Sequence, residues 1–178
     1  MRENGKLLLT DHYSETCQYY ALFCGMSQGK AFEDFLLRTY GTEASANLPE
    51  ASNMLTGHCL RLAWLLASGY RGQCLEEAKL LFLNMAKRTG TLWENDQPSA
   101  SCNHGFTSVL TVFLVDALFG YKGYDVRKKQ LIFAEDYCKD SDCRLLLTVQ
   151  GQPLEIFVKN GKRKIINGTG FKIKGEEK

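Results

Sequence analysis

Several features that mark special classes of protein are missing from this sequence. Polar residues interrupt every apolar stretch well before the roughly 18 residues needed to span a bilayer, and residues 1–10 lack the long apolar core of a signal peptide. The net charge is only +2, a field too weak to favour binding to nucleic acid. We therefore expect neither a membrane nor a nucleic acid as a partner.

Cysteine is present but lacks the pattern of a metal site. The seven cysteines form no C-x-x-C pair, and their odd number does not suggest a disulfide framework. This usage predicts a reducing compartment and, with no signal peptide visible, favours the cytoplasm, provided that Met1 is the true N-terminus. No motif requires a metal or another cofactor, so we expect none.

The remaining composition is that of an ordinary globular protein, because 44% of the 178 residues are hydrophobic and 24% are charged. Five segments have helical periodicity, and each is followed by a glycine, the residue that most often ends a helix in the left-handed conformation. The predicted helices cover residues 13–24, 30–40, 50–68, 72–89 and 104–119.

The apolar pattern predicts how these helices pack. In the fourth helix Leu75 and Phe82 recur on one face, whereas Glu76 and Glu77 are assigned to the opposite, polar face. The third and fifth helices are apolar nearly all round, so we expect neighbours on both of their sides. Short connections favour antiparallel αα-hairpins, and five successive helices therefore predict an arc that belongs to a bundle, a solenoid or a toroid.

After Tyr124 the sequence changes to short alternating runs typical of strands. These runs cover residues 131–134, 145–149, 154–159, 164–167 and 171–174. Asn160-Gly161 is the strongest hairpin signal, because both positions tolerate the positive φ of a type I′ turn, and Gly151-Gln152 marks a second turn. We predict a helical domain over residues 1–124 and a β-sheet domain over residues 125–178.

Basic residues gather in this second part of the chain. They alternate with apolar residues, so we interpret them as the solvated face of strands rather than as a binding patch. The set consists of Lys159, Lys162, Arg163, Lys164, Lys172 and Lys174.

The connection between the fourth and fifth helices is the best candidate for a functional site. It is long and polar, and loops held by a rigid scaffold often carry function. Trp93 beside Glu94 suits a sugar, because an aromatic plane stacks on a pyranose and a carboxylate activates water. His104 offers a hydrogen bond to a hydroxyl. In a purely structural interpretation, Asn103 caps the last helix, Trp93 covers the hairpin and Asp96 forms a turn.

A second polar cluster lies at the start of the first helix. Asp11 or Ser14 suits a helix cap there, and Glu15 suits the positive end of the helix dipole. If the helices alternate in direction, this start lies at the same end of the array as the loop before the fifth helix. Glu15 and Gln18 then face the same cavity as Glu94.

Two short motifs in this loop resemble a known family. Gly-Thr-Leu-Trp-Glu at 90–94 and Ser-Cys-Asn-His-Gly-Phe at 101–106 resemble the Thr-x-x-Trp-Glu and Ser-x-Asn-His pair of the α-L-rhamnosidase-like six-hairpin glycosidases. The helix that carries Glu15, and the strands after residue 126, resemble the corresponding upstream helix and C-terminal β domain of that family.

The resemblance implies an (α/α)6 toroid with a central active site and an inverting hydrolysis of terminal α-L-rhamnosides. It assigns Glu94 as the general base, Trp93 as the adjacent aromatic and His104 as a substrate-contacting histidine. In the resulting glycosidase hypothesis, Asn103 and Glu15 also shape the pocket for a rhamnoside-like carbohydrate. An inverting enzyme also needs a carboxylic acid roughly 6.5 to 9.5 Å from the base. The family's acid lies upstream, and this sequence has no counterpart.

The expected fold is therefore mainly α: a partial (α/α)6 toroid of about five helices arranged as αα-hairpins, followed by a small antiparallel β unit. A full toroid needs twelve helices, so we interpret the chain as a C-terminal fragment that is inactive alone and whose partner is the missing N-terminal part. The alternative is a non-catalytic helical module that binds another protein or a sugar.

Overall fold

The computed structural model describes residues 2–3, 6–7, 14–26, 29–41, 48, 51–52, 55–95, 97 and 99–174. The chain divides into two compact units, and each unit combines two stretches of sequence. Unit 1 contains Met1–Trp64 and Glu76–Thr107, and unit 2 contains Leu65–Leu75 and Ser108–Lys178. The division runs through two helices, α3 (Leu55–Ala67) and α4 (Arg71–Thr89), rather than through a linker.

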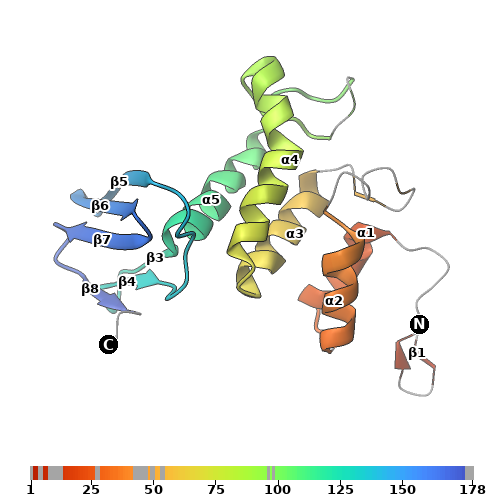
Figure 1. The fold of residues 1–178 in the computed structure, drawn as a ribbon, viewed down its shortest axis with the longest axis horizontal. Coiled ribbons are helices and arrows are strands. Elements are labelled where there is room, and N and C mark those ends of the chain that lie inside the picture. The colour runs from red at the N-terminus through yellow and green to blue at the C-terminus, as the bar shows by residue number, and fades with distance from the viewer. Residues whose placement is uncertain are drawn as a thin grey trace. The chain divides into compact units, whose positions relative to one another are not determined.

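Unit 1 is built from helices (Figure 1). It contains α1 (Glu15–Phe23), α2 (Lys30–Thr39), most of α3 and most of α4. Two short strands, β1 (Arg2–Glu3) and β2 (Lys6–Leu7), pair antiparallel before α1. The five glycines predicted to end helices, Gly25, Gly41, Gly69, Gly90 and Gly120, all have positive φ values between 63° and 84°. These helix ends are confirmed.

Arg61 organises the core of unit 1. Its side chain is 1% exposed, and all five of its N–H groups donate hydrogen bonds. The acceptors come from three other helices and one helix end: the Glu77 carboxylate on α4, the Tyr19 hydroxyl on α1, and the carbonyls of Leu36 and Tyr40 in and after α2. One side chain thus connects four helices of unit 1.

Glu77 corrects one sequence prediction. We assigned it to the polar face of the fourth helix, but it is 4% exposed and its two oxygens accept from the Arg61 guanidinium at 2.5 and 2.8 Å. The helical pattern failed here because a buried cation can place a carboxylate on an apolar face. Gly41 fits against this pair: its φ is +83°, and a Cβ there would overlap the Glu77 carboxylate.

Unit 2 combines one helix with two three-stranded sheets (Figure 1). After α5 (Val109–Phe119), the first sheet contains β3 (Tyr121–Asp125), β4 (Gln130–Phe133) and β8 (Lys172–Lys174) in the order β3-β4-β8. The second sheet is an antiparallel meander of β5 (Cys143–Val149), β6 (Gln152–Lys159) and β7 (Lys162–Asn167). In the first sheet β3 runs antiparallel to β4, whereas β8 runs parallel to β4.

The two sheets and the end of α5 share one apolar core. Its fully buried members include Leu131 on β4 together with Leu154 and Ile156 on β6, and Phe119 joins them from α5. Arg163 on β7 stabilises the edge of this core, because its guanidinium donates hydrogen bonds to the carbonyls of Phe119 and Ala134. In the same unit, Arg71 pairs with Asp116 on α5 at 3.1 Å and with Asp136 at 3.3 Å.

The hairpin turns test the turn predictions. Asn160 and Gly161 have φ values of 49° and 71°, so the predicted turn with two positive φ positions is confirmed. The second turn lies one residue earlier than we predicted: Gln150 and Gly151 have φ values of 51° and 78°, and Gln152 already begins β6. The difference is small because Gly151 belongs to the turn in both cases.

The expected fold class is wrong. We predicted a mainly α protein with a small antiparallel β unit, whereas the structure is an α+β protein in which two three-stranded sheets enclose a core of their own. The prediction missed β3, because Gly123 interrupts the alternation and a register shift lies between Tyr121 and Gly123. It also expected only antiparallel pairing, which β4 and β8 contradict.

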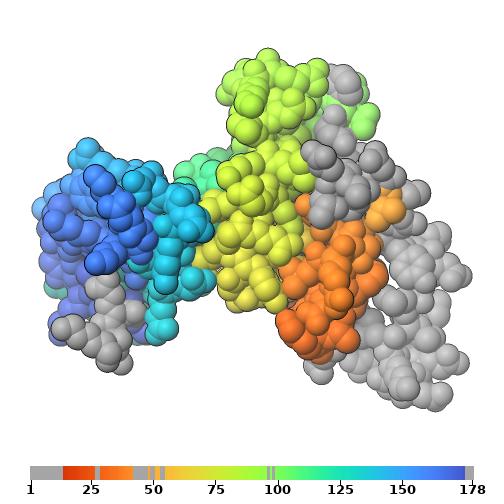
Figure 2. Space-filling model, in the orientation of Figure 1, coloured from red at the N-terminus to blue at the C-terminus, as the bar shows by residue number. Residues whose placement is uncertain are grey.

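Helix α4 runs along the surface in the space-filling view (Figure 2). Its exposed residues include two large apolar ones, Leu80 and Leu83, at 38% and 45% exposure. None of the helices in the described ranges is long and apolar enough to cross a membrane.

Candidate functional site

The loop between α4 and α5 folds back on itself. The backbone N–H of Glu94 donates to the carbonyl of Ser101 at 3.0 Å, and the N–H of His104 donates to the carbonyl of Leu92 at 3.1 Å. The Thr91 hydroxyl adds a hydrogen bond to the carbonyl of Cys102. The two motifs that resemble the glycosidase pair, residues 90–94 and 101–106, therefore lie side by side as two antiparallel segments.

Thr89, the last residue of α4, anchors the first segment. Its hydroxyl lies 2.8 Å from the Thr91 hydroxyl and accepts a hydrogen bond of 2.8 Å from the indole Nε1 of Trp93. Gly90 makes this approach possible, because its φ of 73° ends the helix and turns the chain back toward Thr89. The position of Trp93 is thus fixed by the end of α4.

Trp93 is 3% exposed, which is less than a sugar platform requires. The guanidinium of Arg88 covers its ring at 4.9 Å from the ring centroid. The Trp93 ring therefore packs against its neighbours in the described part of unit 1. A pyranose could stack on this ring only after it displaced the Arg88 guanidinium.

Glu94 has a fixed backbone and a half-buried side chain. Its N–H is held by Ser101, and its carbonyl accepts from the N–H of Leu55, the first residue of α3, at 2.9 Å. Within the described ranges, its carboxylate forms no hydrogen bond and no ion pair. The loop thus presents one acid that no neighbouring side chain there engages.

His104 and Asn103 lie at the far end of the loop. The carbonyl of His104 accepts from Thr107 in a short 3-10 helix, η2 (Gly105–Ser108), and its ring stacks on Phe106 with centroids 5.5 Å apart. Helix α5 begins only at Val109, with Ser108 as its N-cap residue. Asn103 therefore does not cap α5, and its side chain is exposed.

Glu15 is 5% exposed at the start of α1, and both of its oxygens are engaged. One accepts from the Tyr19 hydroxyl at 2.5 Å, and the other accepts from the backbone N–H of Ser52 at 2.7 Å. Ser14 is the N-cap residue but makes no side-chain capping hydrogen bond. Asp11 and Asp96, for which we predicted a cap and a turn, lie outside the described residues.

Glu15 and Glu94 are anchored at the same end of α3. Glu15 binds the backbone of Ser52 and Glu94 binds the backbone of Leu55. Three residues of chain span at most about 11 Å, so the two anchoring points are close together. The structure thus brings the Glu15 carboxylate and the Glu94 backbone to one region of unit 1.

The buried network of Glu15, Tyr19, Arg61 and Glu77 in unit 1 was not predicted from the sequence. Burial raises the pKa of Tyr19 far above its ordinary value, although Arg61 opposes this shift. Burial alone would lower the pKa of Arg61, but the hydrogen bonds and charge of Glu77 raise it overall. Tyr19 stays protonated and Arg61 charged at neutral pH, so the network serves structure rather than proton transfer. The sequence feature that could have indicated this network is Arg61, a charged residue inside an otherwise apolar helix.

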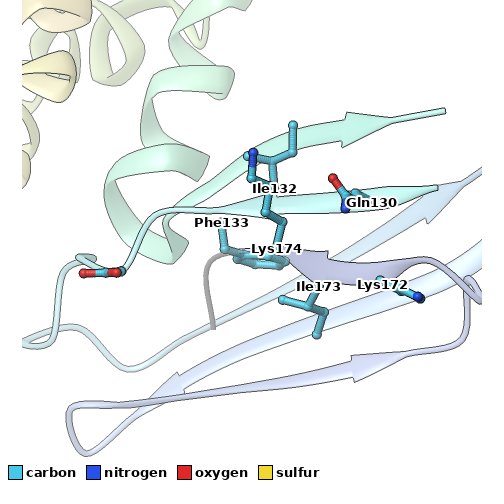
Figure 3. A pocket seen from close by; sticks show the side chains of 7 residues that line it. Gln130, Ile132, Phe133, Lys172, Ile173 and Lys174 are labelled. Atoms are coloured by element: carbon cyan, nitrogen blue, oxygen red, sulfur yellow. The ribbon is translucent and has the colours of Figure 1, made fainter. Parts of the chain in front are cut away.

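Unit 2 contains a separate hollow between β4 and β8. Its volume is about 380 Å³, and Figure 3 shows Gln130 and Ile132 on β4 near Lys172 and Lys174 on β8. Glu135 also lines this hollow, so cations and an anion share it. In the described part of the chain, no three His, Cys, Asp or Glu side chains are placed to hold a metal ion.

The chain matches no protein-family model, no curated protein and no solved structure.

Proposed function

We propose that this chain is the C-terminal part of an α-L-rhamnosidase-like inverting glycoside hydrolase, in which Glu94 acts as the general base. The observation that supports this proposal most is the antiparallel pairing of residues 90–94 with 101–106. This pairing holds the N–H of Glu94, and Leu55 on α3 holds its carbonyl, while its half-buried carboxylate has no partner among the described residues.

A general base needs such a carboxylate. It must be held in place, partly desolvated and free to accept a proton from water. In an inverting glycosidase this water attacks the sugar from the face opposite the leaving group while a carboxylic acid protonates the glycosidic oxygen. Glu94 suits the role of the base, because its backbone is held in place and its side chain is half-buried. His104, at the end of the paired segment, is available to bind a sugar hydroxyl.

The proposed mechanism also needs a general acid. Glu15 is anchored at the same end of α3, but Tyr19 and Ser52 occupy both of its oxygens. We therefore propose that the acid comes from the missing N-terminal hairpins. In this proposal Glu15 shapes the pocket by holding Ser52, and the isolated chain does not hydrolyse glycosides.

Exposed apolar side chains on α1 and α4 support a missing helical partner. Tyr20 and Phe23 on α1, and Met26 just after it, recur every three residues at 49%, 55% and 51% exposure. A stripe of this spacing is the face that an αα-hairpin presents to a neighbour. Leu80 and Leu83 form a similar pair on α4.

Titration of ¹⁵N-labelled protein with L-rhamnose tests the sugar site directly. We expect NMR shifts centred on residues 90–104, because the paired segments carry the sugar-binding groups. Glu94→Gln and His104→Ala should weaken them, whereas Glu76→Gln, which changes an exposed carboxylate on α4, should not. Equal shifts with D-glucose, or no response of the loop to L-rhamnose, would contradict the proposal.

The fragment interpretation has its own test. The purified chain should hydrolyse an aryl α-L-rhamnoside no faster than its Glu94→Gln variant. If the purified chain is active and the Glu94→Gln variant is not, Glu94 is still the base, but the chain then supplies its own acid. The genomic sequence upstream of Met1, translated in all frames, should encode further αα-hairpins rich in Asp and Glu.

A non-catalytic helical module remains the second candidate, and the covered ring of Trp93 favours it. In that case the loop has no access for a pyranose, and the apolar stripe of α1 binds another protein. Tight association with a second chain, combined with no response to sugars, would select this function.

A further inference from the structure

The outer face of the β5-β6-β7 sheet carries an unusual set of charges. On β6 the side chains of Leu154, Ile156 and Val158 point into the core, so the alternate residues Phe157 and Lys159 point outward. The register pairs Lys159 with Lys162 and Phe157 with Lys164 across β6 and β7. Lys159, Lys162 and Lys164 therefore lie on the same outer face as Phe157. Arg144 on β5 pairs with Phe157 in the register and places its guanidinium 5.4 Å from the centroid of the ring.

This arrangement does not stabilise the sheet by itself. Like charges directly opposite each other on antiparallel strands repel, and Lys159 faces Lys162 in this way. Within the described residues, none of the three lysines forms an ion pair. The nearby acids have other partners, because Glu155 pairs with Arg144 and Asp142 accepts from the backbone N–H of Asn160. In the described part of the chain, no ion pair therefore neutralises these three ammonium groups.

The same residues line a hollow. Its volume is about 510 Å³, and its walls are Phe157, Lys159, Asn160, Lys162, Lys164 and Ile166. In the register Phe157 on β6 lies opposite Lys164 on β7, and Ile166 lies two residues beyond Lys164, opposite Glu155. Its lining thus combines apolar side chains with three lysines and includes no acidic residue, and Glu155 opposite Ile166 is paired with Arg144. The hollow between β4 and β8 differs, because Glu135 lines it.

We propose that this hollow binds a carboxylated polysaccharide, a chain of uronic acids. The apolar side chains suit the apolar face of a pyranose, and the lysines suit the carboxylates. Lysines on neighbouring strands lie about 5 Å apart, and lysines two residues apart on one strand lie about 7 Å apart. Carboxylates on successive sugars of one oligosaccharide can reach them together.

Two other anionic partners fit less well. Nucleic acid is usually bound by arginine forks over an extended basic surface, whereas this patch holds three lysines in a chain whose net charge is +2. An anionic membrane presents a flat surface, whereas this site is hollow. The proposal is independent of the glycosidase proposal, because it concerns residues of unit 2 only.

Calorimetric titration with oligogalacturonate tests this inference. We expect binding at low salt that weakens as the ionic strength rises toward about 150 mM, and no binding of a neutral maltooligosaccharide of the same length. The double variant Lys162→Gln and Lys164→Gln should raise Kd about tenfold, because it removes two ionic contacts.

A variant of equal charge separates the site from general attraction. Lys172→Gln and Lys174→Gln remove the same two charges from the β8 strand and should leave Kd within about twofold. Phe157→Leu, which keeps an apolar side chain, should weaken binding at high salt as well as at low salt. Circular dichroism of each variant should match the parent protein.

The inference is overturned by any of three results. The first is an equal loss of affinity in both lysine pairs, which means that only net charge acts. The second is no binding of oligogalacturonate at low salt. The third is stronger binding to a single-stranded oligonucleotide or to vesicles with anionic phospholipid, with the same dependence on Lys162 and Lys164, which assigns the site to another class of partner.

Discussion

The guanidinium of Arg61 and the carboxylate of Glu77 form a two-point ion pair that is buried between α3 and α4. The distances are 2.5 and 2.8 Å, and the side chains are 1% and 5% exposed. Such a pair gives geometric specificity, but its removal from one side leaves a charge inside the protein. This property makes the pair a strong test of the structure.

Arg61→Met should lower the free energy of unfolding by roughly 3–5 kcal/mol, because Glu77 then remains buried without its cation. Urea unfolding followed by circular dichroism measures this loss. The control is Lys79→Met, which removes an exposed pair with Glu76 on the same helix and should leave stability nearly unchanged. A small effect of Arg61→Met would contradict the burial of the pair.

Gly41→Ala should destabilise the protein by roughly 2 kcal/mol or more, because the positive φ strains alanine and the new Cβ meets the Glu77 carboxylate. Gly72→Ala is the matched control. Gly72 lies inside α4 with open space around its Cα, so alanine there should be neutral or should stabilise the helix by up to about 1 kcal/mol. Thermal melts of the two variants should move in different directions, and equal shifts would be the contrary result.

Thr89→Val should expose the ring of Trp93 partly to water, because the indole loses its acceptor. We expect a red shift of tryptophan fluorescence and a loss of about 1–2 kcal/mol in stability. Thr111→Val, at an exposed position of α5, controls for the change of residue type and should alter neither quantity. An unchanged spectrum in Thr89→Val would show that the ring is held by packing alone.

The seven thiols should react with iodoacetamide in an order set by burial. Cys17 and Cys24 are exposed and should react first, whereas burial raises the pKa of Cys59 to about 11 and Cys74 is fully buried. Mass spectrometry of digested samples measures each rate. Rapid labelling of Cys59 near neutral pH in the folded protein would contradict this order.

The raised pKa of Cys59 also fixes the sign of a pH effect. The folded protein holds the thiol proton more tightly than the unfolded chain, whose thiol has an ordinary pKa of 9.0. This contribution to stability is complete below pH 9 and is lost as the pH rises toward about 11. Cys59→Ala should reduce the fall in stability over that interval. An identical pH profile in the variant would remove Cys59 as its cause.

Local signals predicted much of the backbone. A glycine after each helical segment and the Asn160-Gly161 pair act through their own φ values, so they depend little on the rest of the fold. Contacts between distant residues could not be predicted in this way. Glu77 appeared solvent-exposed from helical periodicity, because its partner Arg61 is 16 residues away and lies on another helix.

The candidate site shows the same limit. The composition of the loop singled out Trp93, Glu94 and His104, but it gave no indication that Ser101 and Leu92 pair the two motifs through their carbonyls. The sequence left the role of Trp93 open between a sugar site and a cover for the hairpin, and its packing against Arg88 appears only in the structure. Burial, rather than residue type, separates these two roles.

The parallel pairing of β8 with β4 affects the order in which unit 2 can form. Leu131 pairs with Ile173, so the first sheet gains its last strand only after the intervening β5-β6-β7 meander has been synthesised. Such a contact of high sequence separation slows folding, because a long loop closes before the contact forms. During translation, the β3–β4 hairpin therefore waits with an open edge until the strand that covers it emerges from the ribosome.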